Sequence, residues 1–181
     1  MGTYIGLACN GRMDFARPFE EAAYTWAELA VMLSRICRYN GAIPWSVGQH
    51  LLLCDDLARA LPKLTRRYVR FHDVHEALVM DVPSPLKPFL GAPYADLEAR
   101  AEADVHRRAG LSWPPPLDIA AEVARIDRLA FQHEVWILGQ PVHREGVPQP
   151  RDIEGQRSLN EWRYERAEIV ARTLQTLLET S

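Results

Sequence analysis

The stretch Arg70-Phe71-His72-Asp73-Val74-His75-Glu76-Ala77-Leu78 decides how the rest of the chain is interpreted. No glycine or proline occurs from Lys63 to Met80, so this stretch is predicted to lie inside a helix. At about 100° per residue, His72, Asp73 and Glu76 fall within roughly a third of a turn of one another. An imidazole beside a carboxylate suits a divalent metal, and a second carboxylate one turn later suits proton transfer. Adjacent His and Asp are common by chance, so the pattern gains weight only from further ligand-type residues, namely His50, Asp81 and Asp127.

Capping signals divide the chain before this stretch into helices. A capping box at residues 25–28 predicts a helix that starts at residue 26 and stops at Gly41. A second box at residues 46–49 opens a helix through Leu61, with His50 in its first turn. The motif helix itself is expected over residues 63–80.

The chain after the motif alternates loops and helices. Three prolines in residues 81–88 exclude a regular helix there. Helices are predicted at about 94–109 and 117–138, the second with Asp127 on its apolar surface, and a last helix after a capping box at 158–161. A small hairpin is expected around Asn10-Gly11. We therefore predict a compact, single, all-α domain over residues 1–181.

The composition excludes several classes of protein. The 181 residues are 48% apolar and 25% charged, with a net charge of −3, which argues against a surface for polymeric nucleic acid. Cys9, Cys37 and Cys54 have no metal-type or disulfide-type spacing. With no export-signal pattern, they indicate free thiols in a reducing cytoplasm. No apolar run approaches the roughly 20 residues that span a bilayer, so no membrane association is expected.

Several separated runs carry a family likeness: Leu33–Gly41, Trp45–His50, His72–Ala77 with its continuation through Asp81–Lys87, and Ile126–Ala130. These runs resemble HD-domain nucleotide phosphohydrolases, a group that includes bacterial 5′-deoxynucleotidases and phage-type enzymes that remove triphosphate from dATP. The likeness spans roughly residues 26–138 and implies an HD-type helical bundle that forms homo-oligomers.

The resemblance implies a metal centre. One divalent ion, whether zinc, cobalt, manganese or magnesium, would be held by His50, His72, Asp73 and Asp127. Two imidazoles and two carboxylates reduce the net charge of such an ion to about zero and leave room for water or substrate.

The resemblance also implies roles around that ion. Glu76 and Asp81 would be the acid/base and water-orienting carboxylates, and Arg35 and Lys87 would grip phosphate. The substrate would be a deoxynucleoside 5′-phosphate, cleaved between the 5′ oxygen and the adjacent phosphorus. His75 departs from the family pattern and places an extra imidazole next to Glu76.

Ordinary roles compete with each assignment. His50 would otherwise be a packing histidine, Asp127 the partner of a nearby arginine, and Asp81 a cap for the proline-rich turn. Arg38 is a candidate to line a base pocket.

Two functional alternatives stay open beside the hydrolase. One is a non-catalytic HD-type module that binds a nucleotide as a sensor, and the other is cleavage of a cyclic nucleotide or an unrelated phosphoester. Within the hydrolase hypothesis, the added charge of Lys87 and Arg35 slightly favours a triphosphate over a monophosphate.

Overall fold

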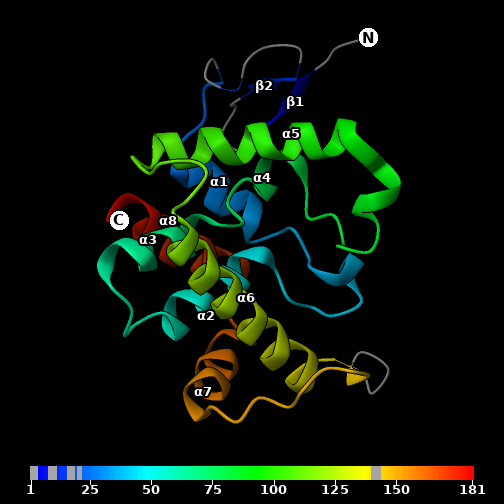
Figure 1. Cartoon of the computed structure of the whole chain (residues 1–181), viewed down its shortest axis with the longest axis vertical. Helices are drawn as coiled ribbons and strands as arrows, with labels where there is room; N and C mark the ends of the chain where they lie inside the picture. The colour runs from blue at the N-terminus through cyan, green and yellow to red at the C-terminus, as the bar shows by residue number, and fades with distance from the viewer. Residues whose placement is uncertain (1–3, 8–11, 16–18, 20–21, 140–143) are drawn as a thin grey trace.

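The computed structural model, shown in Figure 1, describes residues 4–7, 12–15, 19, 22–139 and 144–181. Two helices begin at capping boxes that the sequence predicts. The side chain of Thr25 caps α1 (Trp26–Leu33), and that of Ser46 caps α2 (Val47–Leu57). Reciprocal caps of this kind satisfy N–H groups that a helix start leaves unpaired. The predicted starts are confirmed.

The predicted ends of these two helices are wrong. α1 ends at Leu33 because the backbone of residues 36–38 pairs with that of residues 45–47 through hydrogen bonds of 2.9 Å, which replace helical ones. A short 3-10 turn, η3 (Tyr39–Gly41), follows with positive φ angles. α2 likewise ends at Leu57, four residues before the predicted end. The segment after α1 is thereby turned back toward the start of α2.

The motif stretch is not a continuous helix. α3 (Lys63–Phe71) and α4 (Glu76–Val79) are separated by a turn at residues 72–75. In this turn, His72 Nδ1 donates to the carbonyl of Val69 at 2.7 Å, and His75 Nδ1 donates to the carbonyl of His72 at 3.0 Å. These bonds accompany a turn in which the backbone N–H groups of Val74 and Glu76 bond the carbonyls three residues before them.

Of the next two helices, α5 (Lys87–Arg108) matches the prediction only at its end. It begins at Lys87 instead of residue 94, so the exclusion of helix from residues 81–88 is wrong for the last two of them, where Pro88 is tolerated in the first turn. The helix is kinked at Gly91, whose φ of 68° lies outside the helical region. Gly110, with a φ of 69°, follows its end, as expected for a helix stop. α6 (Leu117–Ile137) agrees with the predicted helix to within one residue and carries Asp127 at its middle.

The last predicted helix is two helices. α7 (Ile153–Trp162) is capped by Asp152, whose side chain accepts from the N–H of Gly155, and α8 (Ala167–Glu179) follows a break. Ser158, expected to be a cap, instead lies inside α7 and donates to Asp56 Oδ2 at 2.6 Å. A tertiary contact therefore uses the side chain that the sequence pattern assigned to a helix start.

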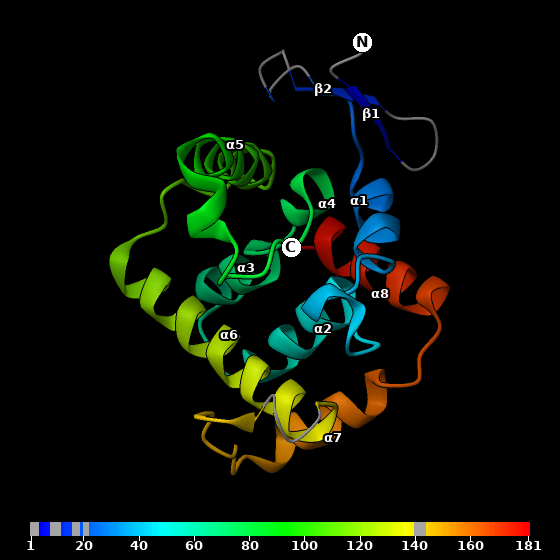
Figure 2. The same ribbon diagram turned by 90° about the vertical axis from the view of Figure 1, so that its right-hand side faces the viewer.

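The N-terminal segment contributes a two-stranded antiparallel ribbon. β1 (Tyr4–Gly6) pairs with β2 (Arg12–Asp14), with Tyr4 opposite Asp14. The expected turn residues Asn10 and Gly11 lie outside the described residues. The ribbon lies at the same end of the molecule as α5 (Figures 1 and 2).

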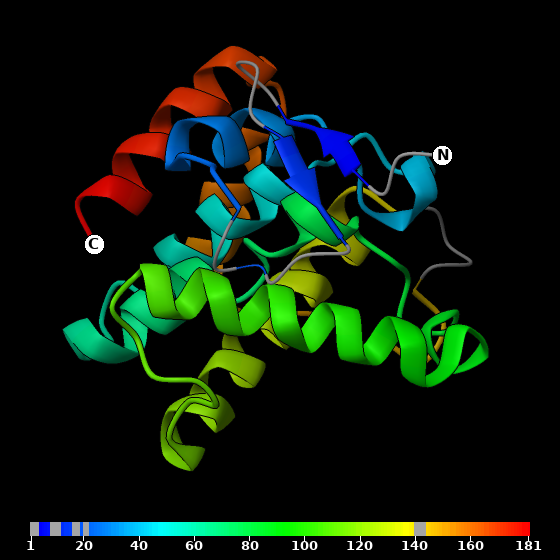
Figure 3. The ribbon, with the colours of Figure 1, turned by 90° about the horizontal axis from the view of Figure 1, so that it is seen from above.

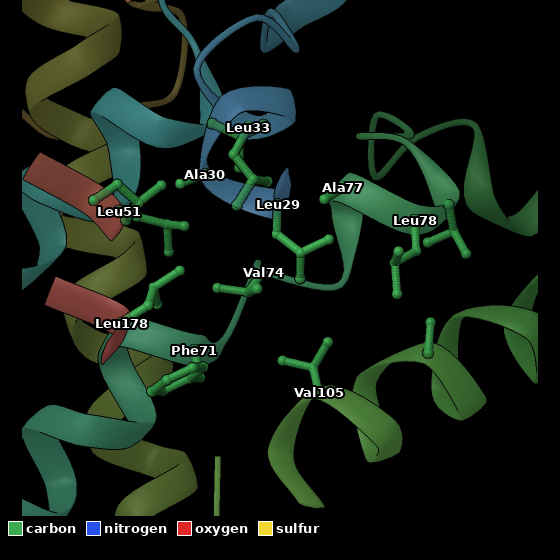
Figure 4. Packing of buried hydrophobic residues seen from close by; sticks show 14 of the residues in the cluster. Leu29, Ala30, Leu33, Leu51, Phe71, Val74, Ala77, Leu78, Val105 and Leu178 are labelled. Atoms are coloured by element: carbon green, nitrogen blue, oxygen red, sulfur yellow. The ribbon is translucent and has the colours of Figure 1, made fainter. Parts of the chain in front are cut away.

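The apolar core joins most of the helices into one compact all-α domain. α1 packs against α8, as Figure 3 shows, and α2 packs against α3, α6 and α7. Leu29, Leu33, Phe71 and Val74 are among the buried side chains where α1, α3 and the motif turn meet (Figure 4). Because α2 is buried along most of its length, any polar side chain on it must find a partner. No helix in the described part of the chain is long and apolar enough to cross a membrane.

Candidate metal centre

The four predicted ligands converge from three parts of the chain. His50 comes from α2, His72 and Asp73 from the motif turn, and Asp127 from α6. One ligand atom from each lies within 4.8 Å of all the others. His50 Nε2 is 3.3 Å from His72 Nε2, 3.5 Å from Asp73 Oδ2 and 3.3 Å from Asp127 Oδ1. Two donors about 2.1 Å from one ion at a tetrahedral angle would be roughly 3.4 Å apart, so the spacing fits a single ion.

Nδ1 of each imidazole donates a hydrogen bond away from the cluster, so Nε2 is the atom that would bind a metal once the ring has lost its second proton. His50 Nδ1 donates to Glu134 Oε1 at 2.6 Å, and His72 Nδ1 donates to the carbonyl of Val69 at 2.7 Å. A carbonyl only accepts, so the ring proton of neutral His72 is on Nδ1 and the lone pair is on Nε2. Nε2 is the atom that each ring turns toward the cluster. The donor set present therefore fits a divalent ion. Burial lowers the pKa of both imidazoles, but their anionic neighbours outweigh burial and raise it, so a bound ion would have to displace a proton from these rings.

The surroundings of the two aspartates favour their ionised form. Burial raises the pKa of Asp73, but His72, His50 and Arg38 outweigh burial and hold it well below its usual range. Burial is likewise outweighed at Asp127, where His50 lowers the pKa. Two negative charges at this position favour a cation between the imidazoles.

Glu134 holds the His50 ring in place by a hydrogen bond on the side facing away from the other ligands. This residue was not identified from the sequence. It lies on α6 two turns after Asp127, is fully buried, and accepts from the Tyr39 hydroxyl at 2.5 Å as well as from His50. Arg38 Nε lies 3.2 Å from its Oε2. Glu134 could have been identified from its position in the sequence. It is a second charged residue on the apolar face of the predicted helix, seven positions after Asp127.

Glu134→Gln is expected to weaken metal binding by roughly tenfold to a hundredfold, the usual effect of losing a group that orients a metal-binding histidine. The amide keeps the size of the side chain but replaces one oxygen by a donor, so the hydrogen bond that orients His50 is disturbed. Titration with Co²⁺ or Zn²⁺ against a competing chelator measures the change. Unchanged affinity in a variant that melts like the wild type would contradict this role.

Glu76 and Asp81, the predicted acid/base carboxylates, lie beside the ligands. Glu76 begins α4, is 5% exposed, and its Oε2 has no hydrogen-bond partner among the described residues. Burial, followed by the charges of Asp73 and Asp81, raises its pKa well above the usual range. Burial also raises the pKa of half-buried Asp81. A buried carboxyl group that keeps its proton can serve as a general acid.

The two predicted phosphate-binding residues are placed differently. Lys87 borders the centre, although its Nζ bonds Glu98 Oε1 at 2.6 Å. Arg35 is exposed and lines a groove between α1 and α8 with Arg172, so the structure does not bring it to the ligands. Arg38 is at the centre instead, with its guanidinium 3.4 Å from Asp73 Oδ2. The early end of α1 redirects the chain in this way.

Cavities open on two sides of these residues. The acidic cavity, of about 290 Å³, reaches three ligands and is also lined by residues that include His75, Lys87, Glu98, Glu102, His106 and Trp113. Burial raises the pKa of Glu102 to about 7 and lowers that of His106 to about 4. The aromatic cavity, of about 470 Å³, is lined by Arg38, Tyr39, Asp81, Pro83, Ser84, Pro85 and Phe131.

Comparison with known proteins finds a partial relative but no activity. No protein-family model matches the chain. An uncharacterized protein of Rhodobacter capsulatus is 31% identical over 115 residues, which cover 59% of this chain and 59% of that relative's length. The name of that relative states no activity, so the chemistry must be inferred from the site.

Proposed function

We propose that this chain is an HD-type, metal-dependent phosphohydrolase that acts on deoxynucleoside 5′-phosphates at the phosphorus bearing the 5′ oxygen. The observation that carries the proposal is the convergence of two histidines and two aspartates, from separate segments, next to a buried carboxyl group that favours its protonated form. Binding alone needs no such acid, so the arrangement favours catalysis over a sensor.

Each neighbouring residue has a task in this proposal. A divalent ion held by the four ligands would polarise the phosphoryl group and lower the pKa of an attacking water. Glu76 is suited to give its proton to the leaving 5′ oxygen, and Asp81 to orient the water. The guanidinium of Arg38 offers a planar pair of donors to phosphoryl oxygens.

The aromatic cavity suits the nucleoside. Tyr39 and Phe131 have ring centroids 6.3 Å apart, and both line this cavity together with Pro83 and Pro85. Flat apolar surfaces of this kind stack on a base without selecting its hydrogen-bonding edge. Arg38 lines the same cavity, so a nucleotide bound there would have its phosphate end beside the ligands.

The charges around the centre favour a monophosphate over a triphosphate. Among the described residues that line the two cavities, Arg38 and Lys87 are the only lysine or arginine side chains. Lys87 is already paired with Glu98, and the acidic cavity adds Glu102. This environment repels the extra negative charge of a triphosphate. The preference for a triphosphate depended on the combined charge of Arg35 and Lys87 at the site. That preference is therefore no longer supported.

A substrate panel tests the proposal. The purified chain is incubated with each dNMP and dNTP in the presence of Mg²⁺, Mn²⁺, Co²⁺ or Zn²⁺, and nucleoside, phosphate and triphosphate are quantified. We expect nucleoside and phosphate from dNMPs with at least one of these ions. No nucleoside from any combination would overturn the proposed function, whereas nucleotide-dependent thermal stabilisation without turnover would favour the sensor.

Arg38→Lys is expected to lower kcat/KM by about tenfold to a hundredfold, because losing charge-assisted hydrogen bonds to phosphate costs on this order. Lysine retains the positive charge facing Glu134 and Asp73, so the fold is spared. Arg35→Lys is the matched control and should leave kcat/KM unchanged. An equal loss in both variants, or a loss only in the Arg35 variant, would contradict the placement of phosphate at Arg38.

A further inference from the structure

A thiol lies beside the two imidazoles of the metal centre. Cys54 follows His50 by one turn of α2, so both side chains lie on the same face of that helix. Cys54 Sγ is 3.4 Å from His50 Nε2, and these atoms together with a ligand atom of His72 all lie within 4.8 Å of one another. The imidazoles therefore belong to two overlapping groups of possible ligands, one with the aspartates and one with Cys54.

The Sγ–Nε2 distance is in the range for two atoms that share an ion. A sulfur about 2.3 Å and a nitrogen about 2.1 Å from zinc are roughly 3.1–3.6 Å apart for ligand angles between 90° and 110°. The observed 3.4 Å lies within this interval. Sγ also lies 4.0 Å from Nδ1 of the same ring, so it sits beside the imidazole, and ligation requires the thiol to rotate toward the Nε2 lone pair. Cys54 is also fully buried against apolar residues such as Trp45 and Ile126, which hold it in place beside His50.

We propose that Cys54 supplies a sulfur ligand to an ion held by His50 and His72. This inference rests on the metal centre of the proposed function, and it states which metal ions that centre would prefer. Hard ions such as Mg²⁺ and Mn²⁺ would use the aspartates, whereas borderline ions such as Zn²⁺ and Co²⁺ would take the thiolate in place of an aspartate. On binding, the thiol proton passes to solvent as the sulfur–metal bond forms.

Cobalt spectroscopy on the full chain tests the inference. Thiolate bound to Co²⁺ gives an intense sulfur-to-metal charge-transfer band in the near ultraviolet, which nitrogen and oxygen ligands do not give. We expect the band in the wild type and in Cys37→Ser, a control at an exposed thiol, and its loss in Cys54→Ser. Elemental analysis should find one Co²⁺ per chain in all three proteins. Zn²⁺ affinity should fall at least tenfold in Cys54→Ser, while Mn²⁺ affinity stays the same.

The outcomes separate this inference from the proposed function. Bound Co²⁺ without the band, a band that persists in Cys54→Ser, or no bound Co²⁺ would each overturn the sulfur ligand. If the protein hydrolyses nucleotides but shows no charge-transfer band, the proposed phosphohydrolase function stands and the sulfur ligand is wrong. If it shows the band but no hydrolysis, the sulfur ligand stands and the proposed function is wrong. If Cys54→Ser fails to fold, ¹¹³Cd NMR of the wild type reports sulfur ligation directly, and a resonance in the nitrogen–oxygen range would overturn the inference.

Discussion

Replacing Asp73 by alanine is expected to abolish metal binding and hydrolysis together. Asp73 Oδ2 lies 3.3 Å from His72 Nε2 and 3.5 Å from His50 Nε2, so its loss removes a ligand from the middle of the set. Metal affinity should fall by more than the roughly hundredfold that the loss of an outer hydrogen-bonding partner can cost. Elemental analysis after loading with Co²⁺ or Mn²⁺ measures the metal, and nucleoside release measures activity.

Asp118→Ala provides the control for this experiment. Asp118 is exposed in the first turn of α6, the helix that carries Asp127, and lies outside both cavities. This variant should bind one ion per chain and turn over at the wild-type rate. If Asp73→Ala kept a full complement of metal, the assigned coordination would be wrong, whatever its activity.

Glu76→Gln should show the opposite pattern, with metal retained and turnover lost. The Glu76 carboxyl is buried and favoured in its protonated form, and an amide of the same size cannot transfer a proton to the leaving oxygen. General acid–base catalysis contributes about a hundredfold to ten-thousandfold in rate, so kcat should fall by that amount. KM and metal content should stay close to those of the wild type.

Glu102→Gln is the matched substitution for Glu76→Gln. Glu102 lines the acidic cavity and also has a raised pKa, but it is not assigned to the reaction. Its kcat should stay within a few-fold of the wild type, a difference that corresponds to less than about 1 kcal/mol in the barrier. Unchanged turnover in Glu76→Gln would refute the assignment of Glu76 as the acid.

Local signals predicted the starts of α1 and α2 correctly, but not the ends of these two helices or the start of the last one. The caps at Thr25 and Ser46 act through hydrogen bonds within a few residues, so the pattern contains all of the physics that is needed. The end of α1 depends instead on pairing with residues 45–47, and the role of Ser158 depends on Asp56. Contacts between distant segments cannot be inferred from spacing in one sequence.

For the candidate site too, some residues were predicted from the sequence and others depend on tertiary contacts. The family resemblance implied a ligand set that the structure brings together, even though His72 and Asp73 lie in a turn rather than inside a helix. Arg35 was expected at the centre from the family resemblance, but the change of direction after Leu33 brings Arg38 there instead. Glu134 was missed because its role depends on the burial of His50 against α6.

A crystal of the Co²⁺-loaded chain, measured at the cobalt absorption edge, tests the central claim most directly. We predict one anomalous peak, at about 2.0–2.3 Å from His50 Nε2, His72 Nε2 and at least one carboxylate oxygen of Asp73 or Asp127. A cobalt peak elsewhere on the chain, or none near these side chains in a fully loaded crystal, would contradict the metal centre and the hydrolase that depends on it.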